Sequence, residues 1–197
     1  MKSRFFSYVP SFPVAMVDRE DDIFTVGHST HELEELVALL RGPGVSGLAD
    51  VRRYPRSRRV PHFNADALEV SLPRLGIEYA HFEELGGRRS PVPGSPNRGW
   101  REEQFQGYAD HMATAEFAAG VERLESLARS RPTAVMCAEA PWWRCHRRLL
   151  SDALLVRGWR VLHLGPDGRL SAHELTDFAI VSEEGLTYPP PQTALEV

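Results

Sequence analysis

The sequence predicts an α/β domain in three layers, with a mostly parallel central sheet of about five strands and helices on both faces. Short apolar segments rich in β-branched residues alternate along the chain with longer segments whose apolar residues recur at helical spacing. Glycines and prolines separate many of these segments. Because strands that alternate with helices form right-handed β-α-β units, we expect the strands to run parallel.

Each strand is predicted from a short apolar run. Ile23 to Val26 is closed by Gly27, and the run from Thr133 to Cys137 is apolar almost throughout. The strands are expected at residues 23–26, 45–51, 77–82, 133–137 and 159–164.

The helices are predicted from apolar periodicity and from residues that begin or end a helix. The first helix carries leucine or valine at positions 33, 36, 37 and 40, with Ser29 or Thr30 as its expected cap, and ends at residues 42–44. Asn64 is expected to open the second helix. Further helices are expected at about 100–129, in one or two pieces, and at 144–156.

The two ends of the chain are predicted to lie outside the core. Residues 1–21 contain two prolines and finish in an acidic run, so we expect a loose lead-in. The single domain is expected at residues 22–180, and residues 181–197, with three consecutive prolines, are expected to form a tail. Residues 86–99 are rich in glycine, proline and arginine and are predicted to form a long, mobile, basic loop.

The composition narrows the class of protein. With 197 residues, 42% hydrophobic and 25% charged, the chain suits one globular domain. Its formal charge of −4 gives no bulk attraction to nucleic acid or to an anionic membrane, so any polyanion must meet a local basic patch. The two cysteines make no disulfide framework, residues 1–11 lack a signal-peptide pattern, and no apolar run approaches the roughly 18 residues of a membrane span. We therefore expect a cytoplasmic protein with free thiols and no membrane partner.

Polar residues follow nearly every predicted strand. His28 follows the first, Asp50 and Arg52 end the second, and Cys137 and Glu139 end the fourth. In parallel sheets, ligands bind beyond the carboxyl ends of the strands. If the second and fourth strands lie side by side, these residues meet at one site.

Asp50 and Arg52 have two interpretations. Asp50 lies in an apolar stretch, so its carboxylate needs a partner, and a structural ion pair with Arg52 is the alternative to a catalytic role. The segment 52–59 holds five arginines in eight positions, with Tyr54 among them. A charge run is typical of a solvated loop, but guanidinium groups beside aromatic rings also suit recognition of phosphates and bases.

Residues 136–148 contain the strongest local pattern. An apolar strand delivers the thiol of Cys137 and the carboxylate of Glu139, and after a Pro-Trp-Trp loop a helix is predicted to begin with basic residues. Arginine in the first turn of a helix opposes the helix dipole, at a cost of about several tenths of a kcal/mol each. An anion at that terminus would remove the cost, so the pattern favours an anion site there.

Several of these segments resemble the family called "domain of unknown function 488". They lie between residues 23 and 164 and are Thr25-Val26-Gly27-His28-Ser29-Thr30, Leu48-Ala49-Asp50-Val51-Arg52 with Pro55-Arg56-Ser57, Gly76-Ile77-Glu78-Tyr79, Leu85-Gly86-Gly87, Gly107-Tyr108-Ala109, and Met136-Cys137-Ala138-Glu139 with Cys145-His146-Arg147. The resemblance implies a compact α/β domain that looks like an enzyme, with no established activity and a link to nucleotides or nucleic acids. Ala49 stands where the family more often has a larger β-branched residue, which bears on packing alone. The Pro-Trp-Trp segment stands where the family loop varies.

We favour an enzyme of the hydrolase class that acts on a nucleotide or nucleic acid, with Glu139 and His146 in acid–base roles. No carboxylate cluster of the two-metal nuclease kind is present in the sequence, and we expect no cofactor. Arg58 would add a phosphate contact beside its neighbours. The predicted catalytic residues are Asp50, Cys137, Glu139 and His146, the predicted anion-binding residues are Arg52, Arg53, Arg56, Arg144 and Arg147, and the predicted ligand contacts are His28, Tyr54, Trp142 and Trp143.

Three alternatives stay open. Cys137 would be the nucleophile of a rhodanese-like or cysteine-phosphatase-like enzyme, although the loop after it has Pro141 and two tryptophans in place of glycines that turn amides toward an anion. Cys137, Cys145 and His146 with Glu139 would suit zinc, but adjacent residues of one helix point about 100° apart, so we expect no metal site. The third alternative is a nucleic-acid-binding module without activity.

Overall fold

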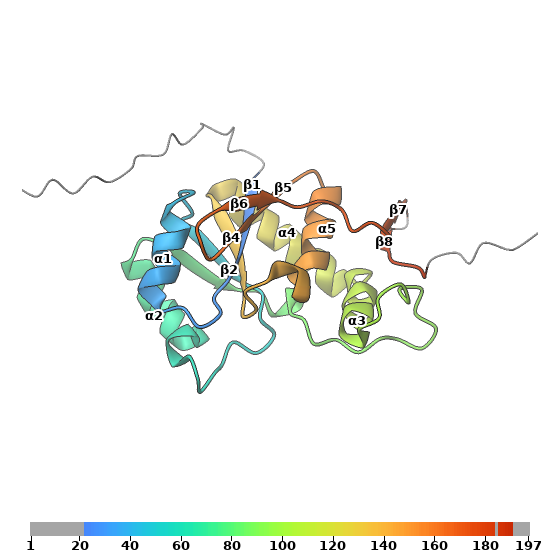
Figure 1. Cartoon of the computed structure of the whole chain (residues 1–197), viewed down its shortest axis with the longest axis horizontal. Helices are drawn as coiled ribbons and strands as arrows, with labels where there is room; N and C mark the ends of the chain where they lie inside the picture. Colours follow the sequence, from blue (N-terminus) through green and yellow to red (C-terminus); the bar gives the residue numbers. More distant parts are fainter. Residues whose placement is uncertain (1–21, 184, 191–197) are drawn as a thin grey trace, which may run out of the picture.

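A six-stranded sheet forms the centre of the protein (Figure 1). The computed structural model describes residues 22–183 and 185–190. The strands are β1 (Asp22–Gly27), β2 (Gly47–Asp50), β3 (Glu78–His81), β4 (Thr133–Cys137), β5 (Arg160–Leu164) and β6 (Leu170–Ala172), in the order β3-β2-β4-β1-β5-β6. Strands β1 to β5 pair in parallel, which confirms the predicted sheet, and β6 runs antiparallel to β5. The three residues of β6 are exposed and form no apolar run, so the sequence did not indicate this strand.

Helices cover both faces of the sheet, as predicted (Figure 1). Successive side chains of a strand point to opposite faces, so Phe24 and Val26 pack with α1 and α2 while Ile23 packs with α4 and α5. The helices of the described residues are α1 (Leu33–Arg41), α2 (Ala65–Arg74), α3 (Glu103–Met112), α4 (Ala115–Ser130) and α5 (Arg147–Val156), with short 3₁₀ turns η2 (Pro61–Phe63), η3 (Glu83–Leu85) and η4 (Trp142–Arg144). The protein is therefore a three-layer α/β fold.

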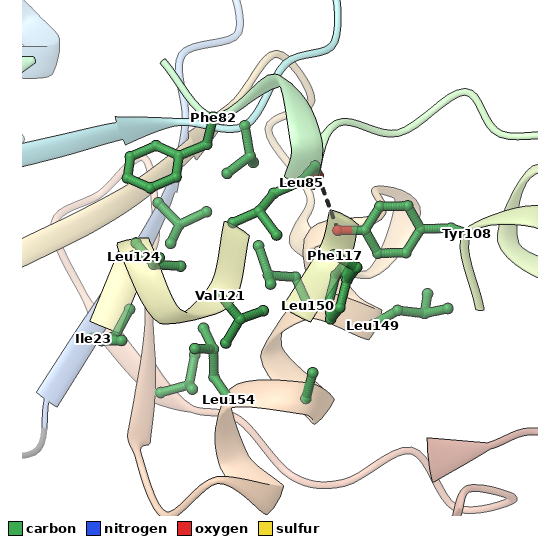
Figure 2. Close-up of a cluster of buried hydrophobic side chains, with 14 of the residues drawn as sticks. Ile23, Phe82, Leu85, Tyr108, Phe117, Val121, Leu124, Leu149, Leu150 and Leu154 are labelled. Carbon is green, nitrogen blue, oxygen red and sulfur yellow. Dashed lines mark hydrogen bonds between the residues drawn. The ribbon is translucent and has the colours of Figure 1, made fainter. Parts of the chain in front are cut away.

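Figure 2 shows the core beneath α4 and α5. Leu124 of α4 and Leu154 of α5 are fully buried in it, and Tyr108 of α3 donates a hydrogen bond from its hydroxyl to the carbonyl of Leu85 at 2.9 Å. Each large apolar side chain buried in this way stabilises the fold by about 1.5–3 kcal/mol. This cluster fixes α5, and therefore the segment that leads into α5 from β4.

Two helix starts differ from the sequence-based prediction. Helix α1 begins after Glu32, which forms a capping box with Glu35, whereas Ser29, one of the two expected caps, has a positive φ of 48°. Helix α5 begins only at Arg147, because residues 142–144 form the separate turn η4 and Cys145 has an extended backbone. As a consequence, Cys145 and His146 both precede the helix.

The folded domain extends beyond residue 180, where it was expected to end. Strands β7 (Ile180–Ser182) and β8 (Gly185–Thr187) form a hairpin, and Tyr188 beyond it is fully buried, with its hydroxyl 2.8 Å from Asp152. The expected lead-in at 1–21 and the last residues of the expected tail lie outside the described residues.

The segment 86–99, predicted to be mobile, is anchored to α3. The carboxylate of Asp110 accepts hydrogen bonds from the backbone amide of Val92 at 2.9 Å, the hydroxyl of Ser95 at 2.6 Å and the side-chain amide of Asn97 at 2.8 Å. Across the residues that the structure describes, no helix has the length and apolar character needed to cross a membrane.

Candidate functional site

Three parallel strands end together at one edge of the sheet. Strand β4 lies between β2 and β1, with Asp50 opposite Met136 and Gly27 opposite Cys137. Helix α1 follows β1 on one face and α5 follows β4 on the other, which is the arrangement of a topological switch point. The crevice beyond these strand ends is the expected place for a ligand, and β2 and β4 are neighbours as predicted.

A pocket of about 550 Å³ occupies this crevice. Among the described residues that line it, Glu139 is the one acidic side chain, while arginine is the most frequent residue. The arginines are Arg52, Arg53, Arg56, Arg59, Arg88 and Arg144. Cys137 and Cys145 are buried, whereas Arg56, Arg59 and Arg144 are exposed, so the thiols mark the inner end of the pocket and the guanidinium groups its rim.

Arg52 lies at the edge of the pocket, and its guanidinium nitrogens form hydrogen bonds to other residues of the protein. Its Nε and Nη2 donate to the two carboxylate oxygens of Asp50, at 2.8 and 2.5 Å, and Nη2 also donates to the carbonyl of Phe63 at 2.7 Å. Tyr79 donates its hydroxyl proton to the same carboxylate at 2.8 Å. Asp50 is fully buried behind Arg52 and does not line the pocket, which matches the structural ion pair considered as the alternative.

His28 completes this buried network. Its Nδ1 donates to the carbonyl of Ser29 at 3.0 Å, which leaves Nε2 to accept from Nη1 of Arg52 at 3.1 Å. Burial and the positive charge of Arg52 lower the pKa of His28 to about 4, so its ring is neutral near pH 7. The ring stacks on Phe63 with centroids 4.3 Å apart, and it lines the pocket.

Two thiols and one imidazole meet at the inner end of the pocket. Nδ1 of His146 lies 3.5 Å from Sγ of Cys145 and 3.9 Å from Sγ of Cys137. On the other side of the ring, Nε2 donates to the carbonyl of Val51 at 3.0 Å. The objection that Cys145 and His146 point apart on one helix is therefore wrong, because both residues precede α5.

The two thiols differ in acidity. Burial raises the pKa of Cys145, but a hydrogen bond from the Cys137 thiol, followed by the contact with His146 and the nearby charge of Arg147, outweighs it and places that pKa well below its usual range. The same hydrogen bond, together with burial, raises the pKa of Cys137 well above its usual range. Cys145, which was not among the predicted catalytic residues, is the more acidic thiol.

Arg147 does not face the pocket, although it was predicted to bind an anion. Its side chain is 1% exposed, and its Nη2 donates to the carbonyls of Glu139 and Ala140 in the loop after β4. The neighbouring Arg148 donates to the hydroxyl of Thr176 at 3.1 Å. These two arginines at the start of α5 therefore contact the protein itself, and Arg144 in η4 is the one that reaches the pocket.

The two tryptophans lie outside the pocket lining. Trp142 stacks on His163, with ring centroids 3.9 Å apart, and packs edge-on against Trp143. His163 belongs to a buried chain in which Nδ1 meets the Thr25 hydroxyl at 2.7 Å and Nε2 meets His173 at 3.0 Å. Trp142 thus holds the η4 turn against the sheet, and neither tryptophan is placed to contact a ligand in the pocket.

Glycines make the close packing of the site possible. A Cβ at Gly87 would lie 2.7 Å from Nδ1 of His146, and one at Gly27 would lie 2.0 Å from the carbonyl oxygen of Glu139. Gly87 does not have a positive φ, and its lack of a side chain leaves room for the imidazole. Positive φ occurs instead at Ser29 (48°) and Arg88 (58°), and both of these residues line the pocket.

The structure thus brings together most of the predicted residues and adds others. Tyr54 is 60% exposed and lines the pocket, while Arg58 does not line it. Predicted residues in the lining are His28, Arg52, Arg53, Tyr54, Arg56, Cys137, Glu139, Arg144 and His146; added residues include Ser29, Arg59, Gly87, Arg88, Gln104, Phe105 and Cys145. Arg59 and Cys145 carried a signal in the sequence, since one extends the arginine run and the other precedes His146, whereas Gln104 and Phe105 carried none.

A family model for the domain of unknown function DUF488 matches residues 32–154. The chain belongs to the DUF488 family. The match includes β2, β4, the thiol pair and His146, so the inner end of the pocket lies within the family domain. Comparison with curated proteins and with solved structures found no match.

Proposed function

We propose that this DUF488 protein is an enzyme that binds a nucleotide-sized, phosphate-bearing ligand in the arginine-lined pocket and acts on it at the inner end. The observation that carries the proposal is the composition of the pocket lining among the described residues, six arginines against one carboxylate. Planar guanidinium groups match the paired oxygens of a phosphate, and a charge excess of this kind attracts an anion despite the net charge of −4.

The size of the pocket favours a nucleotide over a long polymer. A volume of about 550 Å³ falls within the range of about 300–1,000 Å³ typical of small-ligand sites. The ring of Tyr54, exposed at the rim beside Arg53, is available to stack on a base. The phosphates would then lie between Arg56, Arg59 and Arg144, with the reacting group directed toward the thiols and His146.

The acid–base groups lie at the inner end and on the loop above it. Glu139 lines the pocket with an exposed side chain, and its backbone carbonyl is held by Arg147. His146 is held by its bond to the Val51 carbonyl, which leaves Nδ1 directed toward the sulfur atoms. Fixed donors and acceptors of this kind suit proton transfer to and from a bound ligand.

A cysteine-dependent enzyme of the rhodanese or phosphatase type is less well supported. In such enzymes the loop after the cysteine turns its amides toward the anion. Here the carbonyls of Glu139 and Ala140 bond to Arg147, the carbonyl of Ala138 accepts from Ser29 at 2.9 Å, and Pro141 has no amide proton. The loop is therefore held to the rest of the protein by hydrogen bonds to its carbonyls, which differs from a loop that binds an anion through its amides.

The proposal is tested by ligand binding with a matched pair of neighbouring arginines. Arg59 lines the pocket and Arg58 does not, while both are exposed. Arg59→Gln should weaken nucleotide binding by about ten- to a hundred-fold, the loss of one charge-assisted phosphate contact, and Arg58→Gln should leave it unchanged. Equal effects of the two substitutions, or no binding by wild type at low salt, would contradict the proposal.

The salt dependence of binding identifies the size of the ligand. Mononucleotides and a single-stranded oligonucleotide are titrated over a range of salt concentrations. A mononucleotide gives a shallow slope, while a strand that contacts several phosphates gives a slope of about −0.7 for each in a plot of log affinity against log salt. A steep slope together with much tighter binding of the oligonucleotide would replace the nucleotide with nucleic acid as the ligand.

A further inference from the structure

We infer that Cys137, Cys145 and His146 form a zinc-binding site whose fourth coordination position opens into the arginine-lined pocket. The two Sγ atoms and Nδ1 all lie within 4.8 Å of one another. They come from the end of β4 and from the two residues that precede α5, so the core on either side holds them. The inference goes beyond the proposed function, because it holds whatever ligand the pocket takes.

The distances match a tetrahedral zinc ion. Zn–S bonds of about 2.3 Å and Zn–N bonds of about 2.1 Å at tetrahedral angles place sulfur and nitrogen about 3.6 Å apart. The observed separations from Nδ1 are 3.5 Å to Cys145 and 3.9 Å to Cys137. Both nitrogen–sulfur separations therefore lie within a few tenths of an ångström of the tetrahedral value, and the two sulfur atoms lie within 4.8 Å of each other.

The imidazole is already oriented for this role. A histidine that binds a metal through one ring nitrogen usually donates the other N–H to a carbonyl or carboxylate, which fixes both the tautomer and the ring plane. Nε2 of His146 donates to the Val51 carbonyl at 3.0 Å, so Nδ1 is the unprotonated nitrogen, and it faces the two thiols. Gly87 leaves space beside Nδ1, where any side chain would lie within 2.7 Å.

Charge and access also fit a metal. Two thiolates balance the charge of one zinc ion, so the buried centre would be neutral as a unit. Sites with three protein ligands and one position open to a cavity are typical of catalytic rather than structural zinc. Cys137, Cys145 and His146 all line the pocket, as does Glu139, so a water in the fourth position would be acidified by the metal beside a carboxylate able to accept its proton.

The test is the metal content of the full-length protein, purified with a non-chelating reductant. We expect about one zinc per chain by elemental analysis, or, if zinc is lost in purification, uptake of one equivalent of Zn²⁺. Replacement by Co²⁺ should give the intense near-ultraviolet absorption of thiolate-to-cobalt charge transfer. Cys145→Ser and His146→Gln should each lose most of the bound zinc and weaken its binding by at least tenfold.

Two controls keep the test decisive. His62→Gln changes a histidine whose Nε2 bonds to a backbone carbonyl outside the cluster, and it should retain the zinc. Arg59→Gln should retain zinc while losing the phosphate-bearing ligand, which separates this inference from the proposed function. Wild type that takes up neither Zn²⁺ nor Co²⁺, zinc retained in both ligand variants, or a Cys137–Cys145 disulfide formed in air in the presence of zinc would overturn the inference.

Discussion

Two groups of arginines lie in and around the pocket, and the sequence does not distinguish them. Arg52 and Arg147 are buried and each donates hydrogen bonds to protein acceptors, whereas Arg56, Arg59 and Arg144 are exposed at the rim of a pocket. Arg52 and Arg56 lie only four positions apart in one basic segment. The comparison shows that an arginine-rich segment at the end of a strand serves both the scaffold and the ligand.

The two groups differ in what a substitution leaves behind. Without Arg52, the fully buried carboxylate of Asp50 loses the cation that balances it, whereas removal of Arg56 exposes nothing new. Buried charges without partners cost several kcal/mol, while surface substitutions usually change stability by less than about 0.5 kcal/mol. Stability and ligand affinity should therefore respond to different arginines.

The largest effect should come from Arg52→Met. This change leaves Asp50 with the hydroxyl of Tyr79 and one backbone amide as partners, and we expect the free energy of unfolding to fall by about 3–5 kcal/mol in urea denaturation. Arg56→Gln is the matched control and should change it by less than about 0.5 kcal/mol. The double variant Asp50→Asn/Arg52→Met should recover part of the loss; an Arg52→Met protein as stable as wild type would remove the distinction between the groups.

An intermediate effect is expected for Arg147→Met. The partners of Arg147 are neutral carbonyls of Glu139 and Ala140, and among the described residues its Nε has no hydrogen-bond partner. Loss of the side chain leaves two carbonyls unpaired but, unlike the loss of Arg52, breaks no ion pair with a buried carboxylate, so the free energy of unfolding should fall by about 1–3 kcal/mol. A loss as large as that for Arg52→Met would mean that the charge of Arg147 beside the Cys145 thiol contributes more to stability than the two carbonyl contacts do.

The smallest effect should have the opposite sign. Arg88 lines the pocket with a positive φ of 58°, a conformation that costs a non-glycine residue about 1–2 kcal/mol. Arg88→Gly removes the strain but gives the unfolded chain more freedom, so we expect a net gain of about 0.5–1 kcal/mol in stability. Nucleotide affinity should fall at the same time. Destabilisation measured by the same urea denaturation would show that this backbone is not strained.

The fold was predictable because the strands carry their own pattern. Each of the five parallel strands is marked by a short run rich in apolar residues. The adjacency of β2 and β4 was the assumption on which the convergence of their polar ends rested, and the structure has it. The start of α5 was not predictable in this way. Residues 142–144, the last of which was predicted to begin the helix, form a separate turn in which Trp142 stacks on His163, a residue of the later strand β5. That contact is tertiary, and it lies beside the turn after which Cys145 Sγ and His146 Nδ1 come within 3.5 Å of each other.

The site itself was predictable in place but not in detail. The sequence shows that Arg147 is charged, but not where its side chain points. That orientation depends on the carbonyls of Glu139 and Ala140, in the loop after β4. The same holds for Gly87, whose sequence neighbours suggest a turn while its actual neighbour is the ring of His146. Residues whose role is set by distant contacts are the ones that local pattern misassigns.

The position of β1 in the sheet has a consequence for how the chain folds as it is synthesised. This strand emerges first among the described elements, yet its neighbours are β4 and β5, so Ile23 pairs with Thr133 and Val161. Until most of the chain has left the ribosome, both edges of a buried apolar strand are without partners. Contacts so distant in sequence slow folding, and an exposed strand edge is prone to aggregation in the meantime. This protein should therefore need protection by chaperones during translation more than a helical protein of the same length.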